Sequence, residues 1–342
     1  MDYFYAQVEE KRRPMIVGKI IVVCIYSGRT ADSGVVSSVN YPGRAVGIHA
    51  GMPIIQAKKR APPADTIFLP ADREYYAQVS ADIDTIIRSK MDRTVQASID
   101  EWNAEDEKAA EKAAPLKEAI KRALGLTCSI GVASSLLGAK MAASKSKPDG
   151  LLLLGSEEER KMIDDSDVEK VPGIGPKTAE ALKRLEVQKV RDLGRVDVIT
   201  LVDVFGRKTG TWLHDLGQGL YVTELGEEKE QEEVSRIGTL KEKTRDPQAI
   251  LAKIKELEKD ARDWLSQMRK SYKTIGIIFI TDDMKAHTKS ESFRNPKSWD
   301  SDISKEVREL VLQFLEENPH EVRRVGIRFG NFTDLGGQTT LF

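Results

Sequence analysis

The sequence predicts a multidomain α+β protein, and three observations support this prediction. At 342 residues the chain is longer than one ordinary domain, which favours two to four compact units. Strand-like and helix-like segments alternate in residues 1–154, whereas residues 156–221 contain only short helical segments. Residues 235–333 then follow the order β-α-β-β-α-β, which indicates a ferredoxin-like sandwich.

Residues 1–154 are predicted to form a sheet covered by helices. Apolar runs bounded by turn residues indicate strands, and apolar residues three to four apart indicate helices. Val79, Ile83, Ile86 and Ile87, for example, share one helical face. The predicted strands are 16–24 and 127–133, and the predicted helices are 54–61, 73–90 and 116–124, with 2–10 as a strand-like lead into a further helix.

A glycine-rich hairpin marks residues 156–221. Residues 171–179 read Val-Pro-Gly-Ile-Gly-Pro-Lys-Thr-Ala, between a polar helix that ends near Val168 and a helix at 180–185. Gly-Ile-Gly between two short helices is typical of a helix-hairpin-helix module, in which backbone N–H groups approach a phosphate. A glycine-rich loop between core helices is the alternative.

A charged, aromatic-free linker at 222–234 precedes the last predicted domain. In its final strand Val325, Ile327 and Phe329 alternate with Arg324 and Arg328. Because successive strand residues face opposite sides, one face can pack on helices while the other meets phosphates or solvent. The predicted elements are strands 235–240, 274–280 and 322–329, a looser hairpin arm after 280, and helices 247–268 and 304–317.

Composition sets limits on the class of protein. A formal charge of −1 argues against a uniformly basic nucleic-acid binder. The charge is uneven, however. Residues 1–154 contain 21 basic residues (Lys and Arg) and 18 acidic residues (Asp and Glu), and residues 235–333 contain 20 basic and 16 acidic residues. Residues 222–234 contain one basic and six acidic residues. The sequence contains no run of 18 apolar residues, so it predicts no membrane-spanning helix. Cys24 and Cys128 lie in apolar runs, so we expect buried thiols in an intracellular protein, without zinc spacing.

Two adjacent carboxylates, Asp100 and Glu101, follow the run Ala-Ser-Ile at the end of a short β-branched stretch. Neighbouring strand side chains diverge, so adjacent carboxylates can converge on one ion only at a strand end or a turn. Mg²⁺ takes oxygen ligands and shares them with substrate phosphates. The pair therefore predicts a divalent-cation site, with a solvated acidic turn as the alternative.

Further motifs accompany this pair in order along the chain. They are Asn-Tyr-Pro-Gly-Arg at 40–44, Ala-Lys-Met-Ala at 139–142, Lys-Pro-Asp-Gly at 147–150, and the aromatic-rich segment at 2–10. Together they resemble the Y-family, or translesion, DNA polymerases, in the branch that includes polymerase IV. The resemblance runs from Asp2 to the last residue.

The resemblance implies a right-hand polymerase with a ferredoxin-like palm and a ferredoxin-like little finger. It would add deoxynucleotides across damaged templates by two-metal phosphoryl transfer, with low processivity because the fingers are small. The implied domains are palm 1–4 and 69–154, fingers 5–68, thumb 155–221 with the helix-hairpin-helix, linker 222–234, little finger 235–333 and a clamp-binding tail 334–342.

The resemblance also implies roles for individual residues. Asp100 and Glu101 would be the catalytic ligands of two Mg²⁺ ions, with Mn²⁺ possible. The dNTP would contact Phe4, Tyr5, Tyr41, Arg44 and Lys147, with Tyr5 as the steric gate against a ribose 2′-OH. The templating base would be covered by Val35 and Ser37. Primer–template DNA would contact Gly173, Gly175, Lys177, Thr178, Arg236, Arg324 and Arg328.

The last five residues, Gln-Thr-Thr-Leu-Phe, resemble the peptide that docks on sliding clamps. Gln338 would make polar contacts, while Leu341 and Phe342 would fill the apolar pocket. The implied protein is a monomer in the cytoplasm, associated with the nucleoid, and it binds DNA, dNTP and a sliding clamp but no membrane.

The sequence departs from the family pattern at three places. The third metal carboxylate of the family would stand two residues before Asp2, and Asp2 could replace it only if its strand slid by two residues. After Glu101 the composition favours a helix, where the family has a strand. Ser135-Leu136 stands where the family usually has Asn-Lys.

These departures leave a second function open. It is a catalytically weak or inactive protein on the same fold that binds DNA and the clamp. A deoxynucleotide-binding regulator without DNA contacts is disfavoured by the Gly-Ile-Gly hairpin and the clamp-like tail.

Overall fold

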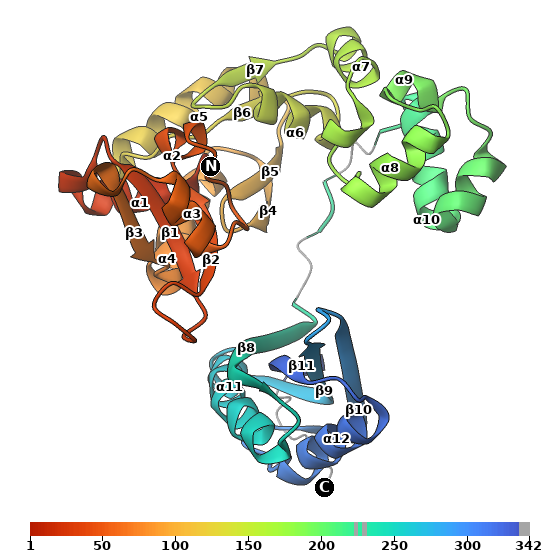
Figure 1. The fold of residues 1–342 in the computed structure, drawn as a ribbon. Coiled ribbons are helices and arrows are strands. Elements are labelled where there is room, and N and C mark those ends of the chain that lie inside the picture. The colour runs from red at the N-terminus through yellow and green to blue at the C-terminus, as the bar shows by residue number, and fades with distance from the viewer. Residues whose placement is uncertain (222–224, 228–230, 335–342) are drawn as a thin grey trace, which may run out of the picture. The chain divides into compact units, whose positions relative to one another are not determined.

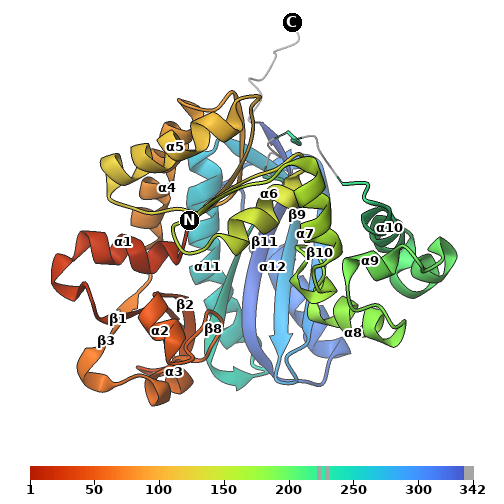
Figure 2. The same cartoon turned by 90° about the horizontal axis from the view of Figure 1, so that it is seen from above.

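The computed structural model describes residues 1–221, 225–227 and 231–334. Contacts group the chain into two compact units. The first consists of residues 1–24, 36–52 and 57–228, and the second of residues 25–35, 53–56 and 229–342. Figures 1 and 2 show the mixture of helices and strands in both units, which confirms the predicted α+β class.

The first helix, α1 (Phe4–Arg12), begins directly after Tyr3, whose backbone is left-handed (φ 31°, ψ 44°). A helix in this segment is confirmed, but the predicted strand-like lead is wrong. Phe4 and Val8 lie one helical turn apart and are buried in the same core as Tyr76. Basic residues in the last turn also favour the helix, because they face the negative end of its dipole.

A three-stranded sheet with the order β2-β1-β3 follows. It contains β1 (Ile20–Tyr26), β2 (Gly34–Val39) and β3 (Thr66–Pro70), with β1 and β3 parallel. The sequence predicts a strand at 16–24, but β1 begins four residues later, at Ile20. Before it, Pro14–Ile16 forms a 3-10 turn and Gly18 has φ 85°, so this part of the chain is not a strand. The connecting elements are α2 (Tyr41–Ala45), α3 (Ile54–Arg60) and the 3-10 turn Pro63–Asp65.

The segment after Glu101 corrects a second prediction. Residues Glu101–Glu105 form strand β5, which pairs antiparallel with β4 (Arg93–Ser98). Trp102 pairs across from Gln96, packs against the core, and donates its indole N–H to Asp84 at 3.0 Å. Pairing and burial thus override the helix-favouring composition. The helices beside this hairpin are α4 (Arg73–Arg88) and α5 (Ala109–Leu124).

A second two-stranded sheet joins β6 (Ile130–Val132) to β7 (Leu151–Leu153) in parallel. Helix α6 (Leu136–Lys145) connects these strands. Gly131 allows close packing, because a Cβ there would lie 2.1 Å from the Ala139 carbonyl of α6. In the described part of the chain, β4-β5 and β6-β7 are two separate two-stranded sheets.

The rest of the first unit is helical. Its elements are α7 (Ser156–Asp164), the 3-10 turn Val168–Lys170, α8 (Pro176–Arg184), α9 (Val190–Leu193) and α10 (Val198–Gln218). Helix α10 bends at Gly206, whose φ of 77° and ψ of 160° are not helical. One apolar core joins Ile163 of α7 and Leu182 of α8 to Leu213 of α10, and it includes Met141 of α6.

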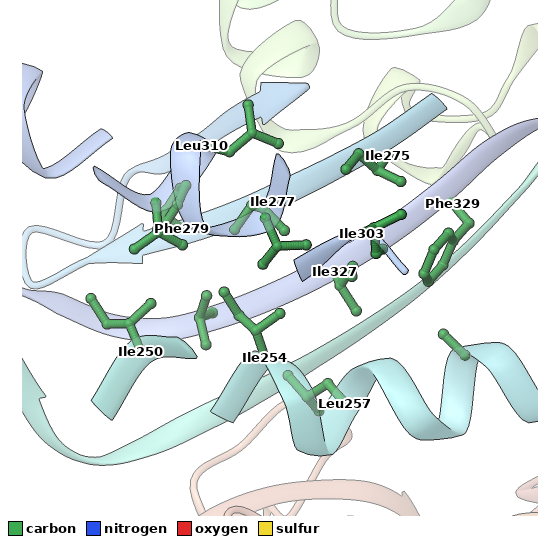
Figure 3. Close-up of a cluster of buried hydrophobic side chains, with 14 of the residues drawn as sticks. Ile250, Ile254, Leu257, Ile275, Ile277, Phe279, Ile303, Leu310, Ile327 and Phe329 are labelled. Carbon is green, nitrogen blue, oxygen red and sulfur yellow. The ribbon is translucent and has the colours of Figure 1, made fainter. Parts of the chain in front are cut away.

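The second unit contains the predicted β-α-β-β-α-β order. Its elements are β8 (Glu233–Thr244), α11 (Pro247–Gln267), β9 (Lys270–Thr281), β10 (Ala286–Lys297), α12 (Ser304–Glu317) and β11 (Val322–Asp334). The antiparallel sheet has the order β10-β9-β11-β8. Ile277, Phe279 and Ile327 of the sheet pack against Ile254 of α11 and Leu310 of α12 (Figure 3).

The predicted burial of the two cysteines is confirmed. Cys24 and Cys128 are buried and form no disulfide with each other. Among the described helices, none is both long and apolar enough to cross a bilayer.

Candidate active site

The two adjacent carboxylates lie at a strand end. Asp100 is in the turn after β4 and accepts a hydrogen bond from the Ser98 hydroxyl at 2.8 Å, and Glu101 is the first residue of β5. Lys140 of α6 forms an ion pair with Glu101, and both side chains remain partly exposed. The turn therefore leaves two adjacent carboxylates partly exposed, and Lys140 supplies positive charge beside Glu101.

A cavity of about 550 Å³ opens beside these carboxylates. Asp100, Glu101, Lys140 and Lys147 contribute polar groups to its lining. Its walls include residues 102–105 of β5, Asp106 directly after this strand, and residues 129–133 around β6. In the described residues β5 pairs only with β4 and β6 only with β7, so two strand edges border the cavity without a ladder partner.

Tyr5 is the second residue of α1. Its ring stacks on Tyr76 with 4.4 Å between centroids. Burial raises the pKa of Tyr5, and the negative charge of Asp100 raises it further. Phe4 is instead 3% exposed and belongs to the apolar core, because consecutive helical side chains point about 100° apart. The structure therefore separates Phe4 from the site where the sequence predicts a dNTP contact.

Tyr41 and Arg44 are brought together by the short helix α2. The Asn40 side chain accepts the Gly43 N–H at 3.3 Å, which caps this helix. The Arg44 guanidinium lies 4.9 Å from the centroid of the Tyr41 ring, and Tyr3 meets that ring edge-on at 5.4 Å. Burial raises the pKa of Tyr41, with a smaller contribution from the charge of Asp2.

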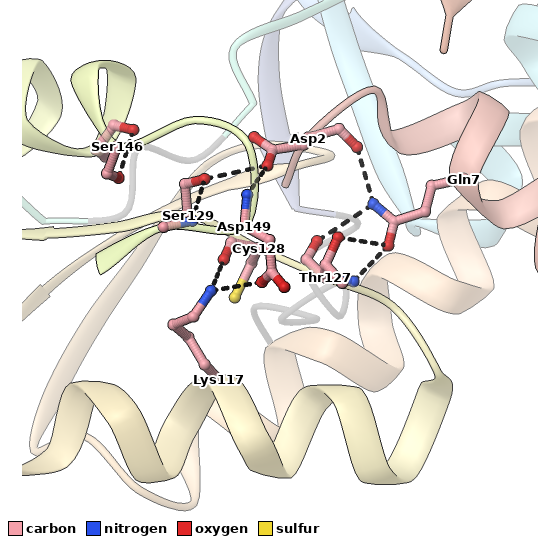
Figure 4. Close-up of polar contacts among 10 residues, drawn as sticks. Asp2, Gln7, Lys117, Thr127, Cys128, Ser129, Ser146 and Asp149 are labelled. Atoms are coloured by element: carbon pink, nitrogen blue, oxygen red, sulfur yellow. Dashed lines mark hydrogen bonds and ion pairs between the residues drawn. The ribbon is translucent and has the colours of Figure 1, made fainter. Parts of the chain in front are cut away.

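Asp2 is held in a buried network beside the cavity (Figure 4). It is 1% exposed, and its Oδ2 accepts hydrogen bonds from the Ser129 hydroxyl at 3.0 Å and the Asp149 N–H at 2.8 Å. Gln7 donates its amide to the Asp2 carbonyl at 3.0 Å, and Lys117 pairs with Asp149 at 2.6 Å. These contacts give Asp2 a structural role at the start of the chain.

Val35 and Ser37 lie on β2, where the buried Val36 separates them. They therefore share one face of the strand. The side chain of Val35 is 41% exposed and that of Ser37 is partly exposed.

The Gly-Ile-Gly hairpin has the local geometry of a helix entrance. Gly173 has φ 98°, a backbone conformation that favours glycine, and a Cβ there would lie 3.2 Å from Trp212. Gly175 is exposed, and a Cβ at this position would meet nothing within 4 Å. Lys177 is exposed and Thr178 partly exposed in the first turn of α8, while Ile174 anchors the hairpin in the core.

In the second unit, Arg324 and Arg328 share one face of β11, opposite the buried Val325, Ile327 and Phe329. Arg328 pairs with Glu233 at 3.2 Å. Arg236 lies directly across from Ile327, which places it on the helix-covered side of the sheet. The structure therefore does not bring Arg236 together with the other two arginines.

The predicted clamp-binding residues Gln338, Leu341 and Phe342 lie outside the described residues. Sequence reasoning missed several contacts of the site, and two of them involve α6. The first is between Lys140 and Glu101, and the second joins Glu159 to the start of α6. Both connect residues far apart in the chain, so no local pattern indicates them.

Comparison with known proteins identifies the family of this chain. Residues 1–144 match the impB/mucB/samB family, and residues 231–341 match the C-terminal domain of that family. Residues 169–220 match the thumb domain of DNA polymerase-iota. A DNA polymerase IV of Methanosarcina acetivorans is 37% identical over 356 residues, which cover 100% of this chain and 97% of that protein. The chain belongs to the Y-family of DNA polymerases, in the polymerase IV branch.

Other Y-family polymerases show the same likeness. A DNA polymerase IV of Saccharolobus solfataricus is 32% identical and covers 100% of this chain and 97% of its own length. A solved Y-family polymerase chimera of Dbh and Dpo4 matches with a TM-score of 0.91, 32% identity and 97% coverage of both chains. An insertion ternary complex of Dbh DNA polymerase matches with a TM-score of 0.69, 32% identity and the same coverage.

Proposed function

We propose that this Y-family polymerase adds deoxynucleotides to a primer opposite damaged template bases, with phosphoryl transfer at Asp100 and Glu101. The observation that carries the proposal is that this carboxylate pair lines one cavity together with Lys140 and Lys147. Phosphoryl transfer needs positioning and charge stabilisation rather than covalent catalysis, and these residue types supply both.

The carboxylate pair suits a hard divalent cation. Asp100 and Glu101 offer oxygen donors, are partly exposed, and lie at a strand end beside the cavity. They would hold Mg²⁺, or Mn²⁺, with the triphosphate as a shared ligand. When bound, the two ions that the family implies stabilise charge on the attacking and leaving oxygens.

The remaining groups fit an incoming dNTP. Arg44 would donate to the triphosphate as a planar fork, and Lys147 would add a point charge. Tyr5 would lie under the sugar and exclude a 2′-OH. Val35 and Ser37, on one face of β2, would cover the templating base and leave room for a damaged one.

DNA would be held without sequence preference. The exposed Gly175 leaves open space where backbone N–H groups of the hairpin can approach a phosphate. Arg324 and Arg328 would contact the backbone from the open face of the second unit, whereas the placement of Arg236 offers no support for the same role. We further propose that the tail docks on a sliding clamp and that the protein acts as a monomer.

The strand edges beside the cavity lead to a proposal about rate. One further β-strand between β5 and β6 would pair with both edges, and its end would reach the carboxylates. The third carboxylate of the family would stand there, while Asp2 is engaged with Ser129 and Asp149. We infer that a polypeptide consisting of these 342 residues binds primer–template and dNTP but extends primers slowly.

Two results would separate the proposed function from the alternative of an inactive DNA- and clamp-binding protein. Single-turnover insertion should proceed, slowly, opposite both an undamaged base and an abasic site. Insertion opposite neither, with DNA bound normally, would favour the alternative.

Tyr5→Ala should admit ribonucleotides. Removing the ring opens the space that a 2′-OH needs, so discrimination between dNTP and rNTP should fall by about 10²-fold, because hindrance that excludes one substrate is lost. Insertion of dCTP and CTP opposite template G measures this ratio. Phe4→Leu is the matched control, because it alters the buried neighbour and should leave the ratio unchanged. If Tyr5→Ala discriminates between dCTP and CTP as the parent does, Tyr5 contributes only to packing of the core.

Arg324→Ala and Arg328→Ala should each weaken primer–template binding without sequence preference. Each lost phosphate contact should lower the magnitude of the salt slope by about 0.9. Titrations at several salt concentrations give the slope. Arg308→Ala on α12 is the control, because this exposed arginine belongs to the helix layer of the same unit. If both variants show the same salt slope of DNA binding as Arg308→Ala, the arginines of β11 do not contact DNA.

A further inference from the structure

Glu159 of α7 is a buried carboxylate, 2% exposed, whose oxygens accept four hydrogen bonds from the loop before α6. Oε2 accepts the Ser134 N–H at 2.8 Å and the Ser134 hydroxyl. Oε1 accepts the Ser135 N–H at 3.2 Å and the Ser135 hydroxyl. All four donors are uncharged. Their number offsets the cost of removing a carboxylate from water.

This carboxylate is built into the start of α6. Ser135 caps the helix, because its hydroxyl oxygen accepts the Gly138 N–H at 3.0 Å while its O–H donates to Glu159. Gly138 is required for the close approach, since a Cβ there would lie 2.1 Å from Oε1 of Glu159. Glu159 is therefore the polar contact that holds the first turn of α6, beside the apolar packing of Met141.

Helix α6 and the residues just after it carry two of the positive charges of the cavity. Lys140 pairs with Glu101, and Lys147 follows two residues after the helix ends. Both line the cavity. A displacement of the first turn of this ten-residue helix would therefore move both ammonium groups relative to the carboxylates.

The other side of α7 is anchored independently. Arg160, the next residue, donates to the carbonyls of Gln218 at 2.9 Å and Gly217 at 3.4 Å, at the end of α10. Ile163 of α7 is fully buried in the core that includes Leu213 of α10. Helix α7 is thus fixed to the helical part of the unit, and Glu159 is its polar link to α6.

We propose that Glu159 is a positioning residue for the incoming dNTP, acting through α6 on Lys140 and Lys147. This inference rests on the proposed function, because it assumes that these lysines face the triphosphate. A side-chain amide at 159 offers one acceptor oxygen, and its NH₂ would face the donors of Ser134 or Ser135, so the link would open.

Glu159→Gln and the milder Ser135→Ala should weaken dNTP binding while leaving DNA binding intact. We expect the dNTP Kd to rise roughly tenfold in Glu159→Gln, since small misplacements of charged groups are costly. The primer–template Kd should stay within about twofold, because the hairpin and β11 are untouched. Fluorescence titrations of the full chain with labelled primer–template, and then with dNTP and Mg²⁺, give the two constants. Glu157→Gln is the matched control, as an exposed glutamate on the same helix.

Two outcomes would overturn the proposal. One is a dNTP Kd in Glu159→Gln equal to that in Glu157→Gln. The other is an equal loss of dNTP and DNA binding in both Glu159→Gln and Ser135→Ala, which would show a general stability role. Failure of the parent chain itself to bind dNTP would instead reject the proposed function, and this inference with it.

Discussion

Asp100→Ala and Glu101→Ala should each reduce primer extension by at least about 10²-fold, because a ligand that fixes charge in the transition state is lost. Primer–template affinity should stay close to that of the parent, since both side chains belong to the β4-β5 turn and neither is part of the hairpin or of β11. Single-turnover extension, together with a DNA-binding titration, separates the two effects.

The matched control for this pair is Glu118→Ala, because Glu118 is an exposed carboxylate on α5. Its extension rate should equal that of the parent. Asp100→Asn and Glu101→Gln keep the side-chain shape and should be nearly as slow as the alanine variants. Parental rates in both Asp100→Ala and Glu101→Ala would show that the cavity is not the catalytic centre.

Replacing Met1 by a β-strand that ends in Asp and one apolar residue should raise the extension rate at least about tenfold. The added strand would pair with the unpartnered edges of β5 and β6 and add the third carboxylate beside Asp100. The rate should also reach its maximum at a lower Mg²⁺ concentration, because a further anionic ligand strengthens cation binding. Extension rates over a Mg²⁺ titration measure both effects.

The informative control is the same added strand with Asn in place of Asp. It fills the cavity and satisfies the strand edges but supplies no charge, so it should raise thermal stability without raising the rate. Fast extension by the unmodified 342-residue chain at low Mg²⁺ would contradict the prediction, because another carboxylate would then complete the site. Equal rates with Asp and Asn would show that the strand matters for packing alone.

Local patterns predicted the elements whose stability depends on their own periodicity. Helix α12 has the predicted bounds 304–317, because Val307, Leu310, Val311 and Phe314 form one apolar stripe. The order β-α-β-β-α-β was predictable for the same reason. Strand β5 was not, because its composition favours a helix and only pairing with β4 and burial of Trp102 make it a strand.

The sequence by itself determined the family, the carboxylate pair at a strand end, and the Gly-Ile-Gly hairpin, because each depends on residues adjacent in the chain. Tertiary structure alone decided that Phe4 enters the core, that Arg236 lies apart from Arg324, and that Glu159 links α7 to α6. Register, helical rotation and packing set these placements, and they join residues separated by 24 or more positions, as Ser135 and Glu159 are. Contacts at such distances arise from the folded backbone as a whole, so no local pattern encodes them.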